Sequence, residues 1–263
     1  MLIADTHVHA YPGYAMDMWW ASAFSNLRAL VPSGASAELG LLLTERHDCS
    51  FFADLAARRS TLPSGYTWER GPEPGVVAVR RAADPADRIW LFAGRQVVTR
   101  EGVEVLALLT PDLFPDREPA DATVAAIRRA GGLPVLPWSP GKWLGRRGAV
   151  VRGLIEAASS APLALGDTTL RPCGLPASPL IRRGRRRKLP VLAGSDPLPF
   201  ADDAVSVGRY AVLVPSFDPA CPVLSLRAAL GARLFTVTGR RDTPVRMVRR
   251  WLANQRMRKG GPA

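Results

Sequence analysis

Two of the chain's three histidines, His7 and His9, lie two residues apart in the opening segment MLIADTHVHAYPG. Side chains two residues apart in an extended strand point to the same side, so both imidazoles can reach one metal ion. Imidazole nitrogen is a ligand for zinc, manganese, iron and nickel. The pair therefore predicts part of a metal site, and the alternative is a hydrogen-bonded pair of structural histidines.

The remaining ligands must come from other parts of the chain. Asp196 follows a predicted strand in VLAGSDP and is the expected carboxylate ligand. It is also a candidate to accept the proton of metal-bound water. His47, in LLTERHD, is the expected fourth ligand, and the alternative is a histidine without a metal role. Four such donors satisfy one divalent ion, with zinc, manganese or iron as the candidates.

A second acidic group with chemical potential is Asp167, which follows a predicted strand in LALGDTTLRP. It is a candidate general base, or a group that orients a histidine ligand. The alternative is a turn or helix cap, a position that aspartate favours. Arg171 follows four residues later and is a candidate to bind an anionic substrate, because its planar guanidinium suits phosphate or carboxylate. The alternative is an ordinary surface arginine.

The segment SPGKWLGRRG, residues 139–148, predicts a loop followed by the start of a helix. Lys142 and Arg146 bring positive charge to this point, and exposed backbone N–H groups at a helix N-terminus favour anions. The glycine spacing differs from that of a P-loop. We therefore expect substrate binding here, with Trp138 and Trp143 either forming a wall of the pocket or lying in the core.

Short apolar runs alternate with helix-like segments along the chain, which indicates a mainly parallel sheet with right-handed crossovers. The predicted strands are residues 2–4, 41–44, 76–79, 89–93, 105–109, 133–136, 163–165 and 189–193. The candidate site residues follow these strands, as expected at the C-terminal mouth of a β/α barrel. The stretch 60–88, rich in Pro and Gly, is expected to be an irregular excursion.

The order of these segments resembles the PHP family, the polymerase and histidinol phosphatase superfamily of metal-dependent phosphoesterases. The segments that carry the resemblance are ADTHVH, LLTERHD, GRQVVTREGVEVLAL, VLPWSPG and VLAGSDPLPF. The resemblance implies a distorted (β/α)7 TIM-like barrel with a cluster of metal ions at its mouth. We expect residues 1–263 to form one such domain, with a basic C-terminal helix at about 240–259.

Several positions depart from the family pattern. Gln96 stands where the family has a bridging glutamate, and we expect it to face the substrate instead. Trp138 or Ser139 stands in place of one family histidine, and Leu198 in place of another. A neutral amide cannot bridge two cations as a carboxylate does. The chain therefore predicts at most one tightly held metal ion.

The favoured function is a metal-dependent hydrolase, a phosphoesterase that acts on a small anionic substrate such as a phosphate ester. An amide or lactone substrate stays open, because an HxH pair with a late aspartate also resembles mononuclear amidohydrolases. The first alternative is a catalytically degenerate PHP-like barrel that binds a ligand. The second is a nucleic-acid-binding protein that uses its arginine clusters.

The formal net charge is +12, and only three of the 35 basic residues are lysines. This excess of arginine is typical of GC-rich coding, so the clusters at 182–188 and 240–259 are first interpreted as solvated surface. RNA or lipid head groups are the alternative partners. No apolar stretch is long enough to span a membrane, no signal-peptide pattern is present, and the three cysteines form no CxxC. These features predict a cytoplasmic protein.

Overall fold

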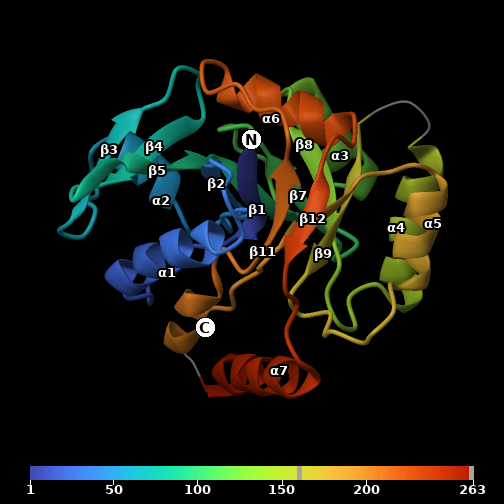
Figure 1. Ribbon diagram of the computed structural model, residues 1–263. Helices are drawn as coiled ribbons and strands as arrows, with labels where there is room; N and C mark the ends of the chain where they lie inside the picture. The colour runs from blue at the N-terminus through green and yellow to red at the C-terminus, as the bar shows by residue number, and fades with distance from the viewer. Residues whose placement is uncertain (159–161, 261–263) are drawn as a thin grey trace.

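The computed structural model describes residues 1–158 and 162–260, and its strands form two sheets at the centre of the molecule (Figure 1). The first sheet has seven strands in the order β12-β11-β1-β2-β5-β4-β3. Its strands are β1 (Leu2–Val8), β2 (Glu38–Leu43), β3 (Tyr66–Arg70), β4 (Val76–Arg81), β5 (Asp84–Phe92), β11 (Tyr210–Val214) and β12 (Thr236–Gly239). The second sheet has the order β10-β9-β8-β7-β6. Its strands are β6 (Gly94–Val98), β7 (Glu104–Leu108), β8 (Leu133–Pro137), β9 (Ala164–Thr168) and β10 (Val191–Gly194).

Helices lie around the outside of these sheets. In Figure 1, α1 and α2 lie on the side of the first sheet, α4 and α5 on the side of the second, and α7 below the strands. The helices are α1 (Met16–Arg28), α2 (Phe51–Ala56), α3 (Ala120–Arg129), α4 (Gly145–Ala157), α5 (Pro179–Arg186), α6 (Pro222–Gly231) and α7 (Pro244–Gly260), with a 3₁₀ helix η1 (Ala201–Ser206).

The predicted distorted (β/α)7 barrel is wrong, because the strands of the described residues form two separate sheets and no closed barrel. The expected mainly parallel sheet is wrong as well, because only four of the ten strand pairs among the described residues are parallel: β1–β2, β2–β5, β8–β9 and β9–β10. The other pairs are antiparallel, among them β1–β11, β6–β7 and β7–β8. The stretch 60–88, expected to be irregular, contributes most of the antiparallel β3-β4-β5 meander. Antiparallel neighbours interrupt the strand–helix alternation that a closed β/α barrel requires.

The two sheets approach each other closely at two places, and a glycine lies at each. At Gly194, at the end of β10, an added Cβ would lie 2.4 Å from the Cβ of His7 on β1. At Gly94, at the start of β6, an added Cβ would lie 2.3 Å from the carbonyl oxygen of Leu43 on β2. A side chain at either position would force the backbones apart. Gly194 thus lets the ends of β1 and β10 come together, where the candidate site lies, and Gly94 does the same for β2 and β6.

The core beneath the site explains why β1 and β2 hold their places. Every residue of β1 is buried, and α1 packs Trp19, Trp20 and Phe24, all fully buried, against the first sheet. The Nε1–H of Trp19 also donates a hydrogen bond of 3.2 Å to the carbonyl oxygen of His9. The aromatic side of α1 therefore fixes the backbone at the point where the second histidine leaves the strand.

α7 occupies the range in which the basic C-terminal helix is expected. Among the residues that the structure describes, no helix is both long and apolar enough to cross a bilayer.

Candidate metal centre

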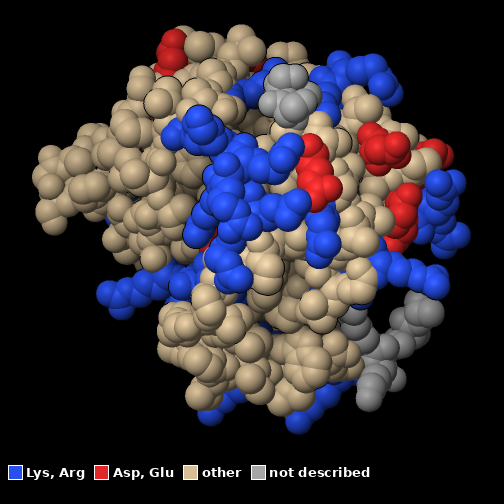
Figure 2. Space-filling view, turned by 90° about the vertical axis from the view of Figure 1, so that its right-hand side faces the viewer, with Lys and Arg blue, Asp and Glu red and all other residues tan. Residues whose placement is uncertain are grey.

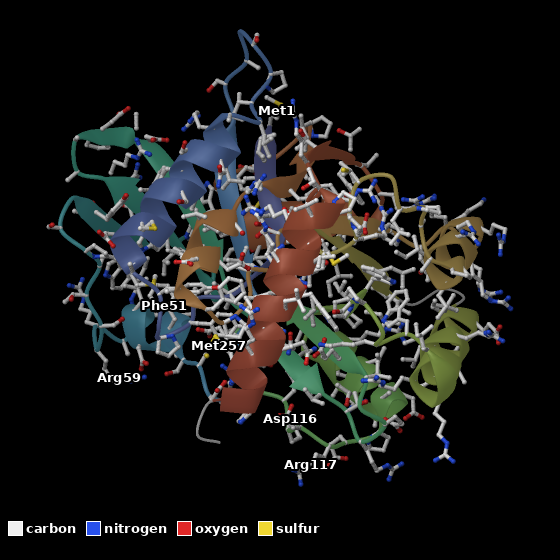
Figure 3. The ribbon with its side chains drawn as sticks, turned by 90° about the horizontal axis from the view of Figure 1, so that it is seen from below. Met1, Phe51, Arg59, Asp116, Arg117 and Met257 are labelled. Carbon is white, nitrogen blue, oxygen red and sulfur yellow. The ribbon has the colours of Figure 1, made fainter. Side chains whose placement is uncertain are left out.

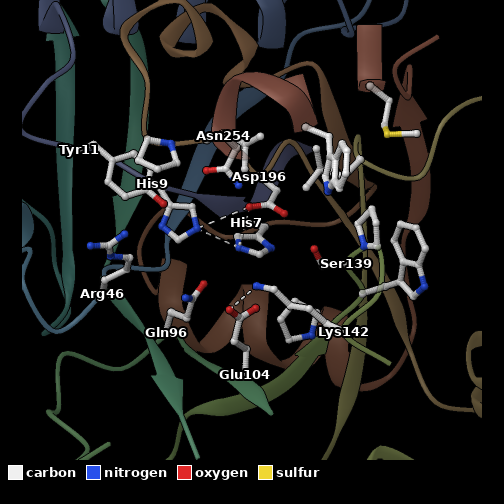
Figure 4. Close-up of a pocket in the computed structure, with 18 of the residues that line it drawn as sticks. His7, His9, Tyr11, Arg46, Gln96, Glu104, Ser139, Lys142, Asp196 and Asn254 are labelled. Carbon is white, nitrogen blue, oxygen red and sulfur yellow. Dashed lines mark hydrogen bonds and ion pairs between the residues drawn. The ribbon is translucent and has the colours of Figure 1, made fainter. Parts of the chain in front are cut away.

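Three side chains converge at the ends of β1 and β10 (Figure 4). The Nε2 atoms of His7 and His9 lie 3.2 Å apart. Oδ1 of Asp196 lies 3.4 Å from Nε2 of His7 and 3.6 Å from Nε2 of His9. All three residues are buried. This group could hold one metal ion, with one nitrogen of each histidine and one carboxylate oxygen as ligands.

The three distances fit a shared cation better than they fit hydrogen bonds. Each neutral imidazole carries a single N–H, so no choice of tautomers satisfies all three contacts among two Nε2 atoms and one carboxylate oxygen. Ligands about 2.0–2.1 Å from one tetrahedral ion lie about 3.4 Å from one another. The donor set of His7, His9 and Asp196 therefore suits a divalent ion that accepts nitrogen and oxygen ligands, with further positions for water.

The ionisation states of His7 and Asp196 also suit a metal ion. Burial lowers the pKa of His7 to about 4, so its imidazole is neutral at pH 7, the form that binds metals. Burial acts to raise the pKa of Asp196, but the nearby imidazoles of His7 and His9 and the ammonium of Lys142 outweigh it. The pKa of Asp196 therefore stays below its usual range, and the side chain is a carboxylate.

Asp5 positions both sides of the site, a role that its place next to the histidines did not reveal. Its carboxylate accepts hydrogen bonds from the backbone N–H of His7 (3.2 Å), Ser195 (2.9 Å) and Gly208 (2.8 Å), and from the hydroxyl of Ser195. Burial raises the pKa of Asp5 to about 7, against the effect of these bonds. Asp5 thus ties β1 to the turn that carries Asp196, which has a left-handed backbone with φ of 49°.

The site forms part of a cavity of about 430 Å³. Besides the three candidate ligands, its walls include Tyr11, Arg46, Gln96, Glu104, Trp138, Ser139 and Lys142 (Figure 4). Residues of α7 also line it: Met247, Trp251, Asn254, Gln255 and Met257. A cavity of this size is typical of small-molecule sites.

Two of the predicted substrate-binding residues, Gln96 and Lys142, line this cavity. The ammonium of Lys142 forms an ion pair with Glu104, which sequence reasoning missed. The sequence signal for Glu104 was a single charged residue at the start of the apolar strand EVLAL. Arg46 also lines the cavity and was not predicted; it pairs with Asp48.

The structure does not bring His47 to the candidate ligands. Its side chain is 75% exposed, and its Nδ1 lies 3.7 Å from Oδ2 of Asp116. β2 ends at Leu43, and the buried Glu45 then forms a parallel β-bridge with Arg95. The chain turns only at residues 46–49, where His47 faces solvent. The turn at residues 46–49 thus directs His47 away from the other candidate ligands.

Asp167 and Arg171 bind each other instead of facing the cavity. Asp167 accepts hydrogen bonds from Nε of Arg171 (2.7 Å) and from the hydroxyl of Tyr210 (3.0 Å). Arg171 donates through Nη1 to the carbonyl oxygen of Leu175 at 2.6 Å. Both are buried and do not line the cavity. Arg146 is exposed near the start of α4 and does not line it either.

The two tryptophans of the 138–143 region have separate surroundings. Trp138 lines the metal cavity and, with Ser139, also a neighbouring cavity of about 480 Å³ between the first turns of α4 and α5. Trp143 lines this neighbouring cavity and belongs to the core beneath it. The wall and core alternatives thus apply to different residues.

The arginine cluster at 182–188 lies mainly on α5, and Figure 2 shows Lys and Arg side chains gathered on this face of the molecule. Arg182, Arg185, Arg186 and Arg187 are exposed. Arg183 pairs with Glu156 of α4. The cluster is therefore a largely solvated basic surface outside the cavity that His7, His9 and Asp196 line.

No protein-family model and no curated protein matches this chain. Solved structures do. PsfC from Pseudomonas syringae PB-5123 is 16% identical and superposes with a TM-score of 0.59, over 98% of this chain and 97% of PsfC. The lesion-specific endonuclease PfuEndoQ from Pyrococcus furiosus is 13% identical, with a TM-score of 0.52 over 89% of this chain and 57% of the endonuclease. At these identities the likeness shows the overall fold alone.

Proposed function

We propose that this chain is a single-metal hydrolase, a divergent relative of the PHP phosphoesterases, that acts on a small phosphate ester. One observation carries the proposal: Nε2 of His7, Nε2 of His9 and Oδ1 of Asp196 lie 3.2–3.6 Å from one another at the wall of a cavity. The fold likeness to a lesion-specific endonuclease supports a phosphoester substrate.

A divalent ion bound by these three residues would act as a Lewis acid and lower the pKa of a bound water to about 7. Side chains of this protein would supply the proton acceptor for the bound water. Asp196 directs Oδ1 toward both histidines, which leaves Oδ2 to accept the proton of the attacking water. Asp167, the other candidate base, is engaged by Arg171 and Tyr210, so we assign proton acceptance to Asp196 alone.

The proposed substrate is small and anionic. Lys142 and Arg46 bring two cationic side chains to the cavity wall, where they can bind phosphate oxygens. Tyr11 stacks on the ring of His9 with centroids 5.0 Å apart, and limits the space beside the ligands. A cavity of about 430 Å³ beneath α7 suits a small ester better than a duplex nucleic acid.

The alternative is a protein that binds the same anion in the same cavity without catalysis. The missing family ligands favour it, because they reduce the site to one metal position. The measurement that separates the two is metal content together with hydrolysis. We expect one equivalent of a divalent metal in purified, untagged protein, and slow turnover of p-nitrophenyl phosphate after loading with zinc or manganese.

The matched variants are His7→Ala, His9→Ala and His47→Ala. We expect the first two to lose the metal and the activity, and the third to keep both, because His47 is exposed and paired with Asp116. Metal without hydrolysis of any phosphate ester supports the binding protein. Wild-type protein that binds no divalent metal rejects the proposal.

A further inference from the structure

α7 forms one side of the metal cavity, and a buried arginine holds it there. Seen from below, the helix lies across the front of the molecule, with Met257 at one end (Figure 3). Met247 and Asn254 of α7 line the cavity. On the same side of the helix, Arg250 is only 4% exposed.

All five N–H donors of the Arg250 guanidinium are used. Nε donates to Oδ1 of Asp203 (2.8 Å), and Nη2 donates to Oδ2 of Asp203 (2.6 Å), which makes a bidentate pair. Nη1 donates to Oδ2 of Asp242 and to Oγ1 of Thr169, both at 2.7 Å. The second bond of Nη2, 2.9 Å long, goes to the backbone carbonyl oxygen of Asp196, the candidate metal ligand.

These partners come from separate parts of the fold. Thr169 follows β9, Asp196 follows β10, Asp203 lies in η1, and Asp242 precedes α7. Asp203 in turn accepts hydrogen bonds from the backbone N–H of Leu198 (2.6 Å) and the hydroxyl of Ser206 (2.9 Å). One guanidinium therefore connects the wall helix, the turn of the carboxylate ligand and the loop that continues from it.

Arg250 contacts Asp196 where the backbone has an unusual conformation. Asp196 has a φ of 49°, a conformation that non-glycine residues rarely adopt and that the surroundings must hold in place. Its N–H donates to the carbonyl oxygen of His7 at 2.9 Å, and its carbonyl oxygen accepts from Arg250. The two bonds fix both peptide groups of the turn, and with them the direction of the carboxylate.

Stability alone does not call for this arrangement. Burying a charged guanidinium with two carboxylates costs desolvation, and apolar replacements of buried ion pairs are often neutral or stabilising. We infer that Arg250 is a positioning residue that fastens α7 against the cavity and orients Asp196 toward His7 and His9. This inference rests on the proposed metal site.

The test uses the histidine side chains as reporters, because the chain has only three histidines. We would label the full chain with ¹⁵N-histidine and record ring spectra of wild type, Arg250→Lys and Arg250→Met, with and without Zn²⁺. His47 serves as the internal control, since it lies outside the ligand group. Zinc affinity would be measured in parallel by competition with a chelator.

Two further variants control for general effects. Arg249→Ala removes an exposed arginine from the same helix. Asp167→Asn weakens a different buried ion pair away from the cavity, and so lowers stability without touching Arg250 or Asp196. Circular dichroism would identify the variants that fold. Arg250→Lys keeps the charge and is the variant to rely on if Arg250→Met does not fold.

We expect Arg250→Lys to weaken zinc binding about 10- to 100-fold, the usual loss when a residue that orients a metal ligand is replaced. In metal-free protein the ring signals of His7 and His9 should shift or broaden while those of His47 stay unchanged. A third variant, Arg250→Ala, leaves room for a small guanidinium, and added methylguanidinium should restore part of its zinc affinity. Arg249→Ala and Asp167→Asn should bind zinc as wild type does.

The inference is overturned if Arg250→Lys and Arg250→Met both bind zinc within about twofold of wild type, or if Asp167→Asn loses as much affinity as they do. It is also overturned if the metal-free spectra of the Arg250 variants match wild type. That last comparison needs no metal. If wild-type protein binds no zinc, the proposed function fails, and the metal-free spectra still decide whether Arg250 positions the site.

Discussion

The close approach of β10 to β1 is the feature whose disturbance has the most definite consequence. In Gly194→Ala, the new Cβ would lie 2.4 Å from the Cβ of His7 and 2.6 Å from its backbone nitrogen. An ordinary contact between such atoms begins at 3.4 Å, so the two backbones must separate by about 1 Å. Neither partner is the end of a flexible side chain, so rotation of a side chain cannot relieve the clash.

The expected result has two parts. Overpacking of this kind costs about 1–3 kcal/mol, so the free energy of unfolding should fall by that amount. Asp196 lies two residues beyond Gly194, so its carboxylate should move relative to the imidazole of His7 by a similar distance. Metal–ligand distances tolerate only about 0.2 Å, and we therefore expect zinc affinity to fall by about tenfold or more.

The measurements are urea unfolding followed by circular dichroism, and zinc affinity by chelator competition. The matched control is Gly153→Ala on α4, where an added Cβ meets nothing within 4 Å. This control should be neutral or more stable by up to about 1 kcal/mol, because alanine favours helices more than glycine does. Wild-type stability and wild-type zinc affinity in Gly194→Ala would refute the account of how the site is assembled.

Three further predictions concern buried charges. Asp167→Asn should lower the free energy of unfolding by about 3–5 kcal/mol, because it leaves Arg171 buried without its carboxylate. Elemental analysis of this variant should still give one equivalent of metal. Glu104→Gln frees Lys142 from its ion pair, so inorganic phosphate should inhibit hydrolysis at a concentration about three- to tenfold lower; unchanged inhibition would argue against Lys142 as an anion ligand. Burial raises the pKa of Glu45 from 4.5 to about 7, so native protein keeps a proton there that unfolded protein loses, and stability falls as pH rises from about 4.5 to 7. Glu45→Gln should reduce this fall by on the order of 3 kcal/mol and leave the share of Asp5, whose pKa burial also raises to about 7. Urea unfolding of both proteins at pH 4.5 and pH 8 would measure the difference.

The antiparallel pairs explain why the sequence suggested a barrel and did not predict the two sheets. Short apolar runs have the same composition whether the next strand follows after a crossover or a reversal, so alternation alone does not distinguish β6–β7 from β8–β9. The stretch 60–88 contains a strand that was not predicted, β3, because the many Pro and Gly residues of this stretch indicated an irregular segment. The resemblance to the PHP motifs supplied the order of the segments, whereas which strand edges pair depends on contacts between distant residues.

The candidate site residues also divide into those that local sequence predicts and those that tertiary contacts decide. His7 and His9 share one side because of the two-residue period of a strand, which is a local property that sequence determines. Asp196 was recognised because a polar residue at the end of an apolar strand is expected at a site edge. His47, Asp167 and Arg171 had the right chemistry as well, but a turn exposes the first, and the other two neutralise each other.

The sequence by itself determined the two imidazoles, their common side and the aspartate that joins them, because strand periodicity and residue chemistry are local. Only the tertiary structure decided that β10 lies against β1 through Gly194, and that Arg250 holds α7 and the turn of Asp196 together. The physical reason is that close backbone approach and a fully paired buried guanidinium require several distant segments at once, and no short stretch of sequence encodes their distances.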